Sequence, residues 1–213
     1  IGQGVCHSDI EEIVAIIGKS EYRNHFLVDS LDRMDFQKNI SHQNNVHKHK
    51  PSNVMISPAT SMGANCFFMS LHIQNECAEL SDHTTGQHVQ GMVLVEAARQ
   101  AMLCVTEEYI LDKNARHSSY FVLNNLQIFF KKFAFPGEIN MRFVISNLER
   151  KKGGTVKADS VTTFYHGSEE LAEISINYTA YPKKYIVEKE DEMARLICGS
   201  LSSSQISSKL NVS

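Results

Sequence analysis

The stretch "SDHTTGQHVQGMVLVEAARQAMLCV", residues 81–105, decides the fold of this chain. Its second half is apolar at nearly every position, and the main exceptions are Glu96, Arg99 and Gln100. A helix on a protein surface needs a wide polar face toward water, and this segment has none. We therefore expect a helix over residues 89–111 that other elements enclose on all sides.

Segments on both sides of this helix alternate apolar and polar residues with the period of strands. The sequence predicts two strands before the helix and four after it, over residues 54–57, 66–73, 119–135, 138–150, 155–165 and 170–181. Pro136-Gly137, Gly153-Gly154 and His166-Gly167 separate the last four and predict hairpin turns of an antiparallel meander. One antiparallel sheet curled around a buried helix is an α+β hot-dog fold, which is the fold class expected.

Composition divides the chain into three parts. Residues 1–45 are expected to form a helical N-terminal extension, because "SDIEEIVAIIGK" carries isoleucines at helical spacing. Residues 46–184 hold the predicted sheet and helix and form the main domain. Residues 185–213 are expected to be a tail with a short helix around Met193 and a serine-rich end.

The charge balance excludes some classes of partner. With 24 acidic and 21 basic residues the net charge is −3, so no overall field attracts nucleic acid or anionic lipid. No apolar run approaches the roughly 18–20 residues that a membrane span needs. We expect a soluble, cytoplasmic protein without nucleic-acid or membrane partners.

Cysteine and histidine spacing bears on redox state and metals. The five cysteines lack CxxC spacing, which favours reduced thiols: Cys6, Cys66, Cys77, Cys104 and Cys198. His42, His47 and His49 have no cysteine or acidic ligand at regular spacing beside them. We expect neither a metal site nor a cofactor.

The polar residues within the central helix form one patch. Glu96 and Arg99 are three residues apart, and Glu96 and Gln100 are four apart, so their side chains meet on one side of the helix. A buried carboxylate is costly unless it is paired. The residues alone allow a structural ion pair that holds the helix to a strand or a second subunit. They also allow an active site in which Glu96 is a base and Arg99 holds an anion, although buried ion pairs are common without catalysis.

Two motifs resemble a known family. The motif "DHTTGQHVQGMVLVEAARQA", residues 82–101, resembles the signature of the AfsA family, the A-factor synthase-like hot-dog proteins of γ-butyrolactone biosynthesis. The upstream "VHKHKPSNVMIS", residues 46–57, is similar to the segment with which that family's domain opens. More distantly, the chain is similar to hot-dog 3-hydroxyacyl-carrier-protein dehydratases, whose catalytic pair is a histidine and an acid. His83 precedes Glu96 at nearly the spacing of that pair.

The resemblance implies an acyltransferase of signal or secondary-metabolite biosynthesis. Its partners would be an acyl carrier protein with a β-ketoacyl chain and dihydroxyacetone phosphate or a similar small phosphorylated acceptor. Glu96 would be the base, Arg99 the phosphate or oxyanion contact, and His83 or His88 the acid/base partner. Further substrate contacts are expected from Gln100, Lys48, His47 and Gly91, the last at the helix start.

The sequence departs from the family in its length. Family members from antibiotic-producing actinobacteria resemble two hot-dog copies in one chain, whereas this sequence has one "EAARQA" and too little length for a second copy. We therefore expect a homodimer. A hot-dog dehydratase or thioesterase and a non-catalytic acyl-binding module remain as alternative functions.

Other residues give weaker signals. Short basic clusters are expected to be solvated or to contact an acidic carrier protein: Lys131 with Lys132, Lys151 with Lys152, and Lys183 with Lys184. Aromatic residues of the predicted strands are expected in the core: Phe129, Phe130, Phe133 and Phe143.

Overall fold

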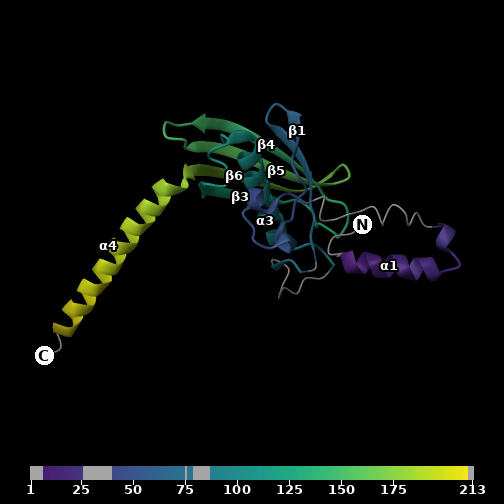
Figure 1. Cartoon of the computed structure of the whole chain (residues 1–213), viewed down its shortest axis with the longest axis horizontal. Coiled ribbons are helices and arrows are strands. Elements are labelled where there is room, and N and C mark those ends of the chain that lie inside the picture. Colours follow the sequence, from purple (N-terminus) through teal and green to yellow (C-terminus); the bar gives the residue numbers. More distant parts are fainter. Residues whose placement is uncertain (1–6, 26–39, 75, 79–86, 211–213) are drawn as a thin grey trace.

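The structure, a computed structural model, describes residues 7–25, 40–74, 76–78 and 87–210. Its centre is helix α3 (Gly91–Val105), which continues into a π-helical turn, η5 (Thr106–Ile110). A six-stranded antiparallel sheet packs around this helix (Figure 1). Eleven of the 15 residues of α3 are buried, so the enclosed helix expected from its composition is confirmed.

The sheet buries one of its two faces. Their bounds are β1 (Thr60–Gly63), β2 (Cys66–Ser70), β3 (Ser119–Phe130), β4 (Asn140–Arg150), β5 (Val156–His166) and β6 (Glu169–Pro182). Val156, Ala158 and Ser160 are buried on the face that covers α3, while Lys157 and Asp159 alternate with them on the outer face. The sheet therefore has an apolar inner face and a polar outer face.

The strand order is β1-β2-β4-β5-β6-β3, so the predicted four-stranded meander is wrong. Only β4, β5 and β6 are joined as a meander, and β3 pairs with β6 instead of β4. The reason is that β2 takes the free edge of β4. The connection from β3 to β4 crosses the start of α3, where the Val89 N–H donates to the Ala134 carbonyl at 2.7 Å. Pro136-Gly137 lies in this crossing and not in a hairpin.

The segment before the helix also differs from the prediction. Residues 54–57 contribute only an isolated bridge between Ile56 and Leu71, and β1 lies where no strand was predicted. Val54, Met55 and Ile56 are fully buried. Their apolar run therefore reflects packing in the core beneath the sheet and not membership of it.

The aromatic residues divide between core and surface. Phe143 is fully buried, as predicted, whereas Phe129, Phe130 and Phe133 are 55%, 55% and 69% exposed. The prediction failed for these three because β3 is an edge strand and the crossing segment runs outside the sheet. Phe129, Phe130 and Phe133 thus form an exposed surface beside the start of α3, here called the aromatic band.

The chain has a helix before the sheet in sequence and another after it. The N-terminal part holds α1 (His7–Lys19) and the short η1 (Arg23–His25). The C-terminal part is one continuous helix, α4 (Lys183–Leu210), which points away from the sheet and replaces the short helix expected near Met193 (Figure 1). Strong helix formers fill its first half and no proline interrupts it. None of the described helices has the length and apolar character to cross a bilayer.

Candidate active site

Glu96 lies at the centre of the candidate site. It projects from the second turn of α3, and its side chain is 14% exposed. Arg99 donates through Nε to Oε2 at 2.7 Å and through Nη2 to Oε1 at 2.8 Å. This bidentate pair fixes the carboxylate in the plane of the guanidinium group. The patch predicted from helical spacing is therefore confirmed.

Lys48 reaches the same carboxylate from outside the helix. Its Nζ lies 2.8 Å from Oε1 of Glu96, and its side chain is 16% exposed. The residue follows a short helix, η2 (Gln43–Val46), whose C-cap His47 has a left-handed backbone with φ of 54°. This turn reverses the chain and brings Lys48 against α3.

Gln100 anchors the site to the segment below it. Its side chain is fully buried, donates to Oε1 of Glu96 at 3.0 Å and donates to the Asn53 carbonyl at 2.9 Å. Its oxygen accepts the Met55 N–H at 2.9 Å. Because every polar atom of this amide has a partner, Gln100 has one defined orientation and positions the Glu96 carboxylate.

The neighbours of Glu96 keep its carboxylate ionised. Burial raises the pKa of Glu96, but hydrogen bonds and charge from Arg99, with hydrogen bonds from Lys48 and Gln100, bring this pKa down to about 2. Glu96 is thus ionised at neutral pH and is a weak base while these bonds persist. Two cations, Lys48 and Arg99, therefore contact one carboxylate.

His47 is directed away from the Glu96 cluster. Its Nε2 lies 2.9 Å from Oε1 of Glu107, a fully buried residue of η5, whose Oε2 accepts the His117 N–H at 2.7 Å. Adjacent residues, His47 and Lys48, therefore hold two carboxylates that lie three helical turns apart. Glu107 and His117 were not predicted from the sequence, although the eleven-residue spacing from Glu96 puts Glu107 on nearly the same helix face.

The remaining predicted residues lie at the start of α3. Gly91 is the first residue of the helix, and an added Cβ there would lie 2.6 Å from Cζ of Phe130. The ring of His88 contacts that of Phe133, with centroids 5.0 Å apart. Both residues therefore border the exposed aromatic band and not the Glu96 cluster. His83 lies outside the described residues.

A family model described as "A-factor biosynthesis hotdog domain" matches residues 28–182. The chain belongs to the AfsA family. The match contains both motifs that resemble AfsA proteins and the entire Glu96 cluster, and it confirms the predicted family and hot-dog fold. A comparison with curated proteins found no match to this AfsA chain.

Solved structures provide distant likenesses to the AfsA chain. A putative thioesterase from Shewanella oneidensis shares 13% identity at a TM-score of 0.48, over 70% of this chain and 100% of that one. A mutant thioesterase from Pseudomonas aeruginosa shares 11% identity at a TM-score of 0.44, over 60% and 81% of the two chains. A conserved protein from the same organism shares 12% identity at a TM-score of 0.43, over 69% and 98%.

Proposed function

We propose that this AfsA chain is an acyltransferase that moves a β-ketoacyl group from an acyl carrier protein to the hydroxyl of dihydroxyacetone phosphate or a similar small phosphorylated acceptor. The observation that carries the proposal is one half-buried carboxylate held by two cations in an AfsA domain. The reaction needs a proton acceptor and positive charge for a phosphate and an oxyanion. Glu96, Arg99 and Lys48 supply these groups.

In the proposed reaction the acceptor hydroxyl oxygen attacks the thioester carbonyl carbon. The C–O bond forms, the C–S bond breaks, and Glu96 accepts the hydroxyl proton. The thiolate of the carrier arm leaves and takes a proton from His83 or His88 as general acid. Backbone N–H groups at the start of α3, from Gly91 onward, would stabilise the oxyanion, since this helix end carries partial positive charge.

The low pKa of Glu96 gives the acceptor phosphate a second role. Phosphate oxygens match the planar donor fork of arginine, so the phosphate competes with Glu96 for Arg99. Loss of the bonds from Arg99 would raise the pKa of Glu96, because burial raises this pKa and the hydrogen bond and charge of Arg99 oppose that effect. Glu96 would therefore become an effective base only when the acceptor is bound, which protects the thioester from attack by water.

The test is a product analysis by mass spectrometry. The protein is mixed with a β-ketoacyl carrier protein, with and without dihydroxyacetone phosphate. We expect the acyl ester and free carrier protein only when the acceptor is present. Release of the free acid at the same rate without acceptor would indicate a thioesterase and contradict the proposal.

A non-catalytic acyl-binding module is the second candidate, and the state of Glu96 favours it. Both carboxylate oxygens are occupied by Arg99, Lys48 and Gln100, as in a structural ion pair. In the same experiment such a module would leave the acyl carrier protein intact under both conditions. The two candidates therefore predict different masses.

We also propose that the chain forms a homodimer through β3. Among the described residues one edge of this strand has no strand partner, and five of its large apolar side chains are exposed: Tyr120, Leu123, Leu126, Phe129 and Phe130. A long apolar edge strand is a template for pairing with another chain. A second copy paired there would cover the aromatic band beside Gly91 and narrow the access to the start of α3.

A further inference from the structure

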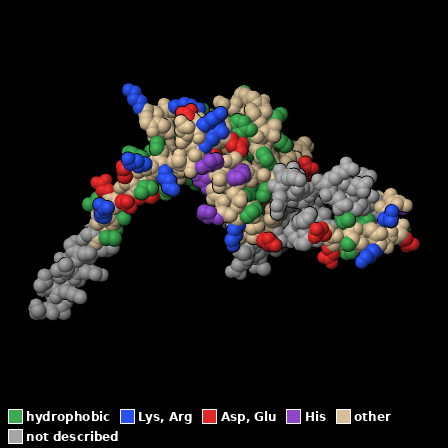
Figure 2. Space-filling view, in the orientation of Figure 1, with side chains coloured by type: hydrophobic (Ala, Val, Ile, Leu, Met, Phe, Trp, Pro, Cys, Tyr) green, Lys and Arg blue, Asp and Glu red, His purple; other side chains and the backbone are tan. Residues whose placement is uncertain are grey.

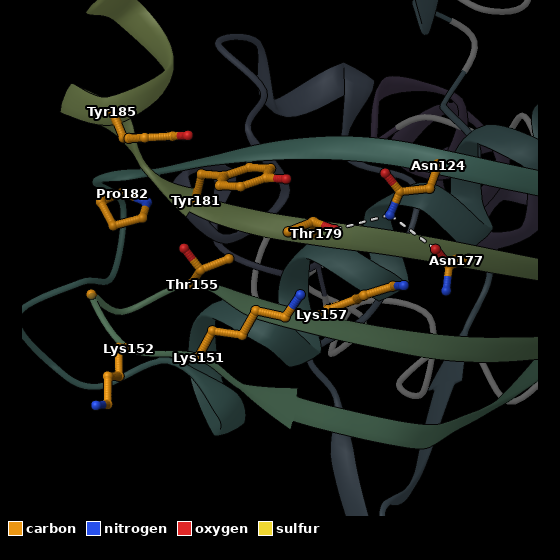
Figure 3. A pocket seen from close by; sticks show the side chains of 11 residues that line it. Asn124, Lys151, Lys152, Thr155, Lys157, Asn177, Thr179, Tyr181, Pro182 and Tyr185 are labelled. Carbon is orange, nitrogen blue, oxygen red and sulfur yellow. Dashed lines mark hydrogen bonds between the residues drawn. The ribbon is translucent and has the colours of Figure 1, made fainter. Parts of the chain in front are cut away.

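The outer face of the sheet carries a groove that the proposed acyl transfer does not use. It lies where the turn from β4 to β5 meets the end of β6 and the start of α4, on the face opposite α3 (Figure 3). Its volume is about 550 Å³. Small-molecule sites have volumes of roughly 300–1,000 Å³. The groove is therefore large enough for a ligand the size of a nucleotide.

Three lysines line this groove: Lys151, Lys152 and Lys157, here called the lysine trio. No acidic residue lines it, and within the described part of the chain no member of the trio forms a salt bridge. By contrast, Lys131 pairs with Glu170 and Lys132 with Glu169 on the rim of the sheet. The trio is thus a local surplus of positive charge on a chain whose net charge is −3.

Two carboxylates lie near Lys157: Glu149, its cross-strand partner on β4, and Asp159 on β5. Asp159 interacts electrostatically with Lys157, two residues away on β5. Its carboxylate also accepts hydrogen bonds from Asn147 and Asn177. The amides hold this carboxylate along the sheet, so they limit its pairing with the ammonium group of Lys157.

Two of the three lysine side chains extend over the same part of the sheet. Lys151 and Lys157 extend over the sheet below Thr179, whereas Lys152 points away from them (Figure 3). Figure 2 shows Lys and Arg side chains gathered over this end of the sheet and the start of α4. Lys151 and Lys157 are therefore the two cations that a ligand in the groove would meet.

An aromatic pair forms another wall. The rings of Tyr181 and Tyr185 are stacked, with centroids 5.9 Å apart and planes inclined by 20°. Tyr185 is 56% exposed, so part of its ring is open to a ligand. A planar base stacks well on such a ring, and this interaction tolerates any base.

We propose that this groove binds a nucleoside phosphate, with its base on Tyr185 and its phosphates at Lys151 and Lys157. Lysine binds phosphate as a point charge on a flexible stem, so Lys151 and Lys157 can both reach the phosphates of one ligand. The stacked tyrosines distinguish the ligand from inorganic phosphate and from an acidic peptide, neither of which has a base. The volume fits one nucleotide and not a strand of nucleic acid.

Isothermal titration calorimetry on the full chain tests the proposal with ATP, adenosine and tripolyphosphate. We expect ATP to bind more tightly than either fragment. Lys151→Gln with Lys157→Gln should weaken ATP binding by about tenfold or more through loss of charge. Tyr185→Ala should weaken ATP binding by a similar factor but leave tripolyphosphate binding unchanged.

The matched control is Lys19→Gln with Lys113→Gln, which removes the same charge from exposed positions outside the groove. It should leave ATP binding unchanged. An equal loss of ATP affinity in the control and groove variants would show that only the net charge of the chain matters, and it would overturn the proposal. So would ATP binding no tighter than tripolyphosphate, or equal displacement of ATP by a polyglutamate peptide.

Discussion

At the scale of single residues, Glu96 shows how neighbours determine the chemistry of a carboxylate. Helical spacing was enough to predict its contact with Arg99 and Gln100, because residues three and four apart always share a helix face. Its contact with Lys48 was not predicted, because the resemblance gave Lys48 only a role in substrate binding. The partner of His47 could not be predicted, because the left-handed turn at that residue sends adjacent side chains to different carboxylates.

Glu96→Gln tests the proposed base. The amide keeps the size of the side chain but cannot accept the hydroxyl proton, so turnover should fall by about 10² or more. The fold should persist, as measured by circular dichroism and a thermal melt. Wild-type turnover in a folded variant would return Glu96 to a structural role.

Arg99→Lys tests the phosphate contact. Lysine keeps the charge but loses the planar fork, so the KM for dihydroxyacetone phosphate should rise while that for the acyl carrier protein stays nearly constant. Steady-state kinetics on both substrates measure this difference. Equal changes in the two constants would remove Arg99 from the phosphate role, and a lower Tm with both constants intact would make it structural.

The low pKa of Glu96 predicts how stability depends on pH. Its pKa falls from 4.5 to about 2 on folding, so the paired carboxylate stabilises the fold above pH 4.5 and loses this effect as the pH falls toward 2. The contribution is on the order of 3 kcal/mol. Urea denaturation of the wild type from pH 6 to pH 2 should show this loss. Glu96→Gln serves as the control, and parallel curves for both proteins would contradict the prediction.

At the scale of elements, the sequence predicts the strands after α3 better than their pairing. Alternation locates β3, β4, β5 and β6 to within a few residues, because it depends only on which side chains face the core. Strand partners depend on contacts between segments that are distant in the sequence. A Pro-Gly pair predicts a turn, but it does not determine which strand the next segment pairs with. β3 was therefore found but assigned to the wrong neighbour.

Gln100→Met tests how α3 is joined to the segment beneath it. Methionine has a similar volume but leaves the Met55 N–H and the Asn53 carbonyl without their partner. Each unsatisfied buried group costs about 1–3 kcal/mol, so the free energy of unfolding should fall by about 2 kcal/mol or more. Urea denaturation measures it, and Gln87→Met, at an exposed position before α3, is the control. A loss equal to that of the control would show that water replaces these bonds.

At the scale of the whole molecule, the exposed side chains of β3 predict assembly. Light scattering coupled to size-exclusion chromatography should give twice the 24.0 kDa of the chain. Phe129→Glu should shift the protein to monomer, because a charge at a dimer interface would be desolvated without a partner. Phe68→Glu, at an exposed position of β2, is the matched control. A dimer that survives Phe129→Glu would contradict assembly through β3.

The position of β3 at the edge beside β6 also bears on how the chain folds during synthesis. β3 leaves the ribosome before β4 and β5, but its only strand partner in the described chain, β6, is made last of the six. Because synthesis proceeds at roughly 5–20 residues per second, β3 has no strand partner for several seconds and its aromatic side chains stay exposed. Nascent chains that stop before residue 169 should therefore engage chaperones, and release should coincide with emergence of β6.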